Sequence, residues 1–330
     1  MVIKFFTFLR TIIDVSKLYK LVKGRITHII NNILPTAMAI TPEEQELWVE
    51  DPVRFVNQVY DMYYEFSNVR TEAGSFVMHL AKVRARDILE PFLSYLTDSF
   101  NRFRTITPTH QDYMNKEWML YALEILASNT LSKDNLKSSV ENVLMNYVFP
   151  EFQSPVGFLR ARACRVYAAF KKLEMNGDHL REVINCLLAC LNDNEFPVCV
   201  TAAVSLQSYI DNDERMKLIK PSIQQVVERF VFLLQKVVVE EIMQTFDMII
   251  NRFEEDLLPL TNSILGILIS AFNEYKRDDD NDSAIFTAMT TIDCISSIVA
   301  NASAKPEYYD GVISLVLPSL MVHSRFLRDV

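Results

Sequence analysis

Residues 119–130, with the sequence MLYALEILASNT, set a pattern that returns three more times along the chain. The later copies are LRARACRVYAAF at 159–170, CVTAAVSLQSYI at 199–210 and VEEIMQTFDMII at 239–250. In each copy the first, fifth and eighth positions are apolar, a spacing that places the three side chains on one face of a helix. Similar helices at intervals of 40 residues predict an array of structural repeats.

A second helix is expected in each interval, because further apolar segments lie at residues 140–148, 184–191, 223–234 and 260–271. Two helices in about 40 residues is the period of HEAT and armadillo arrays, and is too long for tetratricopeptide or ankyrin repeats. No segment alternates apolar and polar residues between turn residues, as a strand would. The sequence therefore predicts an all-α fold, a right-handed α-solenoid of HEAT-type helix pairs.

Proline and asparagine mark the expected helix boundaries. Asp51 followed by Pro52 is typical of an N-cap and a first helical turn. Pro221 and Pro259 lie near the starts of two intervening helices. Asn176, which precedes a glycine, is expected to end a helix.

We expect one solenoid segment over residues 1–330, divided by its repeat pattern. It comprises a partial repeat at 1–40, regular repeats at 52–277, an acidic loop at 278–282 and a truncated last repeat at 283–330. A fifth copy of the pattern is expected six residues late, as Ile285, Met289 and Ile292, because the acidic loop delays it. The apolar residues near both ends suggest a piece of a longer array, since terminal repeats carry a polar outer face.

Composition and charge exclude several classes of protein. The net charge of −9 argues against direct binding to nucleic acid, which needs clustered Lys and Arg. The five cysteines lie inside apolar helical patterns, so we expect buried thiols in a reducing, intracellular compartment. No run of the roughly 18–20 apolar residues that a membrane span requires is evident, and no membrane insertion is expected.

Two motifs resemble a known family. Residues 46–55, ELWVEDPVRF, and residues 148–164, VFPEFQSPVGFLRARAC, are similar to motifs of the importin seven/eight class of the importin-beta (karyopherin) superfamily. Pro197-Val198 and the later residues 290–293, TTID, follow in the same order. The resemblance extends from about Leu21 to the C-terminus and favours the central HEAT repeats of such a receptor.

The resemblance implies a nuclear transport receptor, without catalytic activity or cofactor, that shuttles between nucleus and cytoplasm. Its expected partners are basic nuclear-protein cargo, Phe-Gly nucleoporins and the GTPase Ran. In this family the main Ran-binding repeats are N-terminal, and this chain lacks their motifs. Two alternatives remain open: a structural HEAT scaffold for a protein complex, and an exportin.

The candidate binding residues are mostly acidic. The main candidate for binding basic cargo is the loop of Asp278, Asp279, Asp280 and Asp282. Glu254, Glu255 and Asp256 are weaker candidates, which could instead cap a helix N-terminus through its dipole. Trp48 is also a weaker candidate, which could instead pack between repeats. Arg160, Arg162 and Arg165 are expected to pair with neighbouring acids.

Enzymatic and metal sites find no support in the sequence. Cys186 and Cys190 have helical spacing, but no second pair or nearby His completes a zinc site. The acidic loop lacks the turn Gly and terminal Glu of an EF-hand. No HExxH, GxSxG, P-loop or GxGxxG motif occurs.

Overall fold

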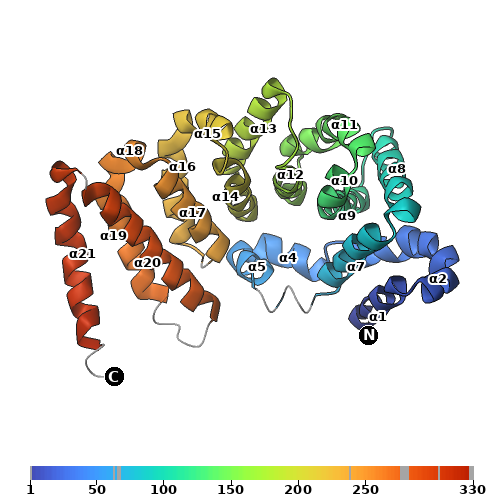
Figure 1. Cartoon of the computed structure of the whole chain (residues 1–330), viewed down its shortest axis with the longest axis horizontal. Helices are drawn as coiled ribbons and strands as arrows, with labels where there is room; N and C mark the ends of the chain where they lie inside the picture. Colours follow the sequence, from blue (N-terminus) through green and yellow to red (C-terminus); the bar gives the residue numbers. More distant parts are fainter. Residues whose placement is uncertain are drawn as a thin grey trace. The chain divides into compact units, whose positions relative to one another are not determined.

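The computed structural model describes residues 2–61, 64, 68–237, 239–275, 282–303 and 305–326. These residues form helices and their connections, with no strand among them. The contacts divide the chain into two compact units, Met1–Ser208 and Tyr209–Val330. Each unit consists of helices packed on their neighbours in sequence, as a repeat array requires (Figure 1).

The first unit carries the N-terminal helices. They are α1 (Val2–Asp14), α2 (Ser16–His28), the π-helix η1 (Ile29–Ile33), α3 (Leu34–Met38), α4 (Pro42–Glu50), α5 (Pro52–Val59), α7 (Val69–Val83), α8 (Ala85–Phe103), α9 (His110–Ile125), α10 (Ala127–Leu131), α11 (Asp134–Val143), the π-helix η2 (Leu144–Val148), the 3₁₀ helix η3 (Phe149–Gln153), α12 (Gly157–Ala169), α13 (Gly177–Cys190) and α14 (Phe196–Ile210), which ends at the boundary.

The remaining helices belong to the second unit. Its elements are α15 (Asp213–Ile219), the 3₁₀ helix η4 (Lys220–Ser222), α16 (Ile223–Leu234), α17 (Glu240–Arg252), α18 (Glu254–Leu257), the 3₁₀ helix η5 (Leu258–Leu260), α19 (Thr261–Tyr275), α20 (Asp282–Ser303) and α21 (Pro306–Phe326). Helix α20 packs against α17 and α19, and α19 packs against α21.

The register of the first four copies is confirmed by burial. The first, fifth and eighth positions of every copy are buried, in α9, α12 and α14 and at the start of α17. These twelve residues are Met119, Leu123, Leu126, Leu159, Ala163, Val166, Cys199, Ala203, Leu206, Val239, Met243 and Phe246. Each helix turns the same face to its neighbours, so the prediction of an all-α HEAT solenoid holds.

The expected register of the fifth copy is wrong. In α20, Met289 and Ile292 are exposed, and the side chain of Ile285 lies outside the described residues. The buried positions are Thr287, Thr291 and Cys294, two residues further along. Threonine can occupy them because its hydroxyl bonds within the helix: Thr291 Oγ1 donates to the carbonyl of Thr287 over 2.7 Å.

Most of the predicted boundaries are confirmed. Asp51 caps α5 by accepting a hydrogen bond from the backbone of Arg54, and Pro221 and Pro259 lie in the short 3₁₀ turns before α16 and α19. The prediction for Asn176 is wrong. Its side chain accepts from the backbone N–H of Asp178 and so begins α13 instead of ending a helix.

The cysteines are free thiols, four of them buried and Cys186 only half-buried. One described stretch, Glu254–Asn273, does have the length and composition of a membrane span, contrary to expectation. A buried core helix meets the same criteria. Within this stretch Ile264, Leu265 and Leu268 are fully packed inside the second unit.

Candidate functional site

A pocket in the first unit lies where α4 and α5 meet α7, α9 and α12. It has a volume of about 150 Å³. Trp48, Phe55 and Val59 supply an apolar wall, and Arg70 and Arg162 supply charged donors. A concave site that combines aromatic walls with a few convergent polar groups is typical of ligand binding.

Helices α4 and α5 each begin with an N-cap residue whose side chain accepts a backbone hydrogen bond. Thr41 and Glu44 form a reciprocal capping box at the start of α4, and Asp51 caps α5. Gln45 Oε1 then lies 2.8 Å from Nε2 of His110, which fastens α4 to the start of α9.

Trp48 fastens α4 to α12 and to the connection before α14. It is 9% exposed and makes edge contacts with Phe55 and Phe158, with ring centroids 4.9 and 6.3 Å away. Its indole Nε1 donates to Glu195 Oε2 over 2.5 Å. Trp48 therefore packs between elements, and it also forms part of the pocket wall.

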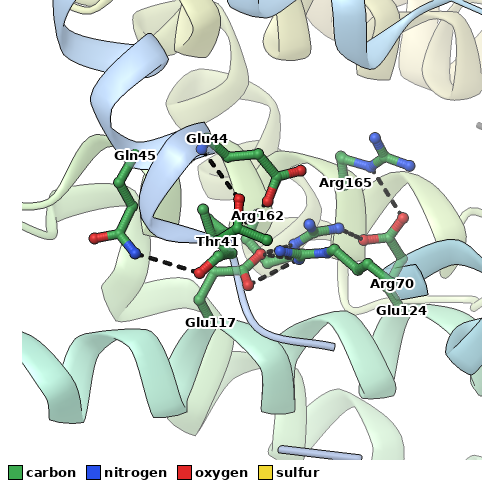
Figure 2. Close-up of polar contacts among 9 residues, drawn as sticks. Thr41, Glu44, Gln45, Arg70, Glu117, Glu124, Arg162 and Arg165 are labelled. Carbon is green, nitrogen blue, oxygen red and sulfur yellow. Dashed lines mark hydrogen bonds and ion pairs between the residues drawn. The ribbon is translucent and has the colours of Figure 1, made fainter. Parts of the chain in front are cut away.

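Three arginines that line the pocket interlock with Glu117 and Glu124 (Figure 2). Arg70 reaches both oxygens of Glu117, at 2.6 and 2.8 Å, and Arg162 Nε donates to the same carboxylate over 2.8 Å. Arg162 also donates to Glu124, which accepts from Arg165 Nε over 3.0 Å. These pairs confirm that the arginines of α12 pair with acids.

The cluster is stacked as well as charge-paired. The guanidinium carbons of Arg70 and Arg162 each lie 4.6 Å from the ring centroid of Tyr121, so two cations contact one aromatic ring. Burial raises the pKa of Tyr121, which keeps the phenol neutral. Burial opposes ionisation of Glu124, but the charges of Arg165 and Arg162 outweigh it and lower the pKa of this carboxyl.

A second charge cluster stands beside Trp48. Arg160 donates to both oxygens of Asp193, at 2.6 and 2.7 Å, and to Glu195 over 3.0 Å. The hydrogen bonds that Arg160 donates to Asp193 are the main reason why the pKa of Arg160 is raised, so this guanidinium stays charged. The cluster fixes Glu195 as the acceptor for Trp48.

The first unit also carries a more apolar groove of about 370 Å³, between α8 and α11. Leu93 and Leu136 line it from opposite helices, and Leu123 and Phe170 lie at its base. Ser94 and Ser139 stand exposed at its rim. Both helices carry apolar residues inside the groove and serines at its rim, so an apolar groove is open to solvent.

The acidic candidates have different surroundings. Asp278, Asp279 and Asp280 lie outside the described residues, and of Asp282 only its place at the start of α20 is described. Glu254, Glu255 and Asp256 lie in the first turn of α18, where their negative charges interact favourably with the positive end of the helix dipole. Asp256 also pairs with Lys220 over 3.0 Å.

Comparison with known proteins identifies the family. The family described as importin-9 central HEAT repeats matches residues 25–251, more than half of the chain. The chain belongs to this family. The resemblance to importins is thereby confirmed, and the transport receptors of this family are HEAT-repeat proteins of the importin-beta class.

Individual relatives agree with the family. The chain is 27% identical over 317 residues to the importin beta-like SAD2 homolog of Arabidopsis thaliana, covering 94% of this chain and 31% of that protein. It is 26% identical over 290 residues to importin-8 of Mus musculus, covering 85% of this chain and 28% of that protein. The chain thus spans about a third of the length of these relatives.

A solved structure shares the fold. The nuclear transport receptor Lph2 of S. cerevisiae, described as bidirectional, superposes with a TM-score of 0.71 at 15% identity. The match covers 90% of this chain and 30% of Lph2. This similarity supports the HEAT architecture of the importin segment.

Proposed function

We propose that this chain is a cargo- and nucleoporin-binding segment of a nuclear import receptor that shuttles between cytoplasm and nucleus. Membership of the importin family, over residues 25–251, is the observation that carries the proposal. The whole receptor would respond to Ran through the N-terminal repeats of the family, whose motifs are not found in this chain. No catalytic activity is part of the proposed role.

The groove between α8 and α11 is our candidate for the nucleoporin contact. Its apolar base and polar rim suit a phenylalanine side chain flanked by glycine, because such a peptide buries its ring and leaves its backbone solvated. Leu93 and Leu136 would contact the ring from the two sides. Several weak contacts of this kind raise the overall affinity through multivalency when one peptide carries many Phe-Gly repeats.

Filling the groove tests this assignment. Ser139→Trp introduces an indole at the exposed rim, and we expect it to abolish binding of a Phe-Gly repeat peptide measured by fluorescence anisotropy. Ser138→Trp is the matched control, because Ser138 is exposed on the same helix and does not line the groove. Equal loss in both variants, or in neither, would remove the groove from the proposal.

The acidic residues Asp278, Asp279, Asp280 and Asp282 remain the proposed attraction for basic cargo. Changing all four to Lys should weaken binding of a Lys/Arg-rich peptide. It should also flatten the salt dependence of that binding, because fewer attractive charge pairs remain for salt to screen. Unchanged affinity at low salt would exclude the loop. In the complete receptor, stronger cargo binding with GTP-bound Ran would instead indicate an exportin.

A further inference from the structure

The arginine cluster has more hydrogen-bond donors than its own carboxylates use. A guanidinium carries five N–H donors. Among the residues that the structure describes, Arg165 donates only through Nε, to Glu124, and Arg70 only through one terminal nitrogen, to Glu117. Arg162 donates through Nε and one terminal nitrogen. The pocket therefore presents unused charged donors to anything that enters it.

The two carboxylates that line the pocket already accept hydrogen bonds. Glu117 accepts from two arginines. Glu44 accepts from the backbone N–H of Thr41 over 2.7 Å and from the hydroxyl of Tyr64 over 3.2 Å. A ligand that brings acceptors is thus favoured over one that brings donors, since donors would compete with bonds already made.

We propose that this pocket binds a carboxylate side chain of a partner peptide, with Arg165 as the main contact. The Arg165 side chain lines the pocket and is 41% exposed, so it can reach a ligand while its Nε stays on Glu124. Its planar fork matches the two oxygens of a carboxylate. The walls of Trp48, Phe55 and Phe158 accept the aliphatic part of the same side chain.

Size and the apolar walls select the ligand class. A volume of about 150 Å³ is far above the roughly 10–15 Å³ that one water needs, and it suits a single side chain instead of a folded surface. A phosphoryl group carries nearly twice the negative charge of a carboxylate. This charge increases both its attraction to the three arginines and its repulsion by Glu44 and Glu117, so charge alone does not separate the two groups. A glutamate side chain is favoured because its aliphatic part can contact the apolar walls, whereas a free phosphate has no apolar part.

This inference does not rest on the proposed transport function. It concerns a site in the first unit, with a charge preference opposite to that of the acidic residues 278–282. A scaffold protein with the same pocket would bind the same group. Failure of the groove or of the acidic loop to bind would leave this proposal unaffected.

Trp48 provides the probe. In the Trp118→Phe variant of the full chain, Trp48 is the one remaining tryptophan, and it lines the pocket. The ligands are the capped pentapeptide Ala-Leu-Glu-Leu-Ala, its Gln counterpart and inorganic phosphate. We expect a saturable change in fluorescence with the Glu peptide and at least tenfold weaker binding of the Gln peptide.

Two variants then assign the contact. Arg165→Gln should weaken the Glu peptide about tenfold or more, because a charged hydrogen-bonded contact is lost. Arg165→Lys should fall between this variant and the parent, because it keeps the charge and loses the fork. Arg181→Gln is the control, since Arg181 is exposed on α13 and pairs only with Asp178 among the described residues.

Several outcomes would overturn the assignment. They are no saturation with the Glu peptide at millimolar concentration, equal response to the Glu and Gln peptides, and tighter binding of phosphate than of the peptide. Equal affinities for the parent and Arg165→Gln would also reject Arg165 as the contact. The Glu and Gln peptides are compared on the Trp118→Phe protein, which is the parent of the arginine variants. This comparison decides the proposal even if Arg165→Gln fails to fold.

Discussion

The indole Nε1 of Trp48 donates to Oε2 of Glu195 over 2.5 Å, although the two residues are 147 positions apart in sequence. Arg160 donates to the other oxygen of Glu195 over 3.0 Å. One carboxylate therefore links α4 to α12 and to the connection before α14. Because α4 forms a wall of the pocket, this link helps to hold that wall in place.

The position of Glu195 depends on the absence of a side chain at Gly157. A Cβ at Gly157 would lie 2.2–2.5 Å from the Glu195 carboxylate, so Gly157→Ala must displace it. We expect a loss of about 2 kcal/mol in the free energy of unfolding, since Trp48 and Arg160 lose a charged partner. Urea unfolding followed by tryptophan fluorescence measures this loss.

Gly177→Ala is the matched control for this substitution. Gly177 also occupies the first position of a helix, α13, but a Cβ there meets nothing within 4 Å. We expect stability to stay equal or to rise by roughly 0.4–1 kcal/mol, because the unfolded chain loses freedom. Similar effects of the two alanines would show that Glu195 moves away without cost.

Glu117 holds two buried cations, and its neutralisation tests the arginine cluster. Glu117 is 1% exposed and contacts Arg70 and Arg162. Glu117→Gln should destabilise the chain by roughly 3–5 kcal/mol, the cost of breaking a buried pair. In contrast, Asp178→Asn removes an exposed partner of Arg181 and should change stability by no more than about 1 kcal/mol. Chemical denaturation of both variants compares these values.

The repeat pattern predicted the fold because neighbouring helices in an array contact each other at a fixed spacing. The same spacing also relates members of the arginine cluster. Arg162 lies 45 positions from Glu117 and 38 from Glu124, about one repeat in each case. Acids and arginines one repeat apart, on the same helix face, could therefore have predicted both partners.

Periodicity could not predict the pocket or the register of α20. The contact from Trp48 to Glu195 joins elements several repeats apart, and no local pattern specifies it. In α20 the more apolar residues Met289 and Ile292 are exposed, whereas Thr287 and Thr291 are buried with a hydrogen bond between them. A scale of hydrophobicity alone cannot detect such internal satisfaction.

The lowered pKa of Glu124 predicts a pH dependence of stability. Burial raises this pKa, but Arg165 and Arg162 lower it further, to below the ordinary 4.5. A carboxyl whose pKa is lower in the folded state contributes stability above its unfolded pKa, and this contribution disappears as the pH falls through the folded pKa. Parent and Glu124→Gln should therefore differ most at neutral pH and converge as the pH falls below 4.5.

Denaturant unfolding of the two proteins at a series of pH values measures this convergence. Asp193 also has a lowered pKa, caused by Arg160 in opposition to burial, but it is present in both proteins and cancels in the difference. A constant difference from neutral to acid pH would mean that Glu124 stabilises the fold without being ionised.

The corrected register of α20 is tested by two isoleucines of the same helix. Ile298 is 5% exposed and Ile292 is 46% exposed, although the original pattern placed Ile292 in the core. Ile298→Ala should cost roughly 2–5 kcal/mol, because it removes buried methyl groups and leaves a cavity. Ile292→Ala should stay within about 0.5 kcal/mol of the parent. If thermal unfolding ranked the two variants in the reverse order, α20 would be rotated toward the register that the sequence pattern favoured, and Thr287 and Thr291 would face solvent.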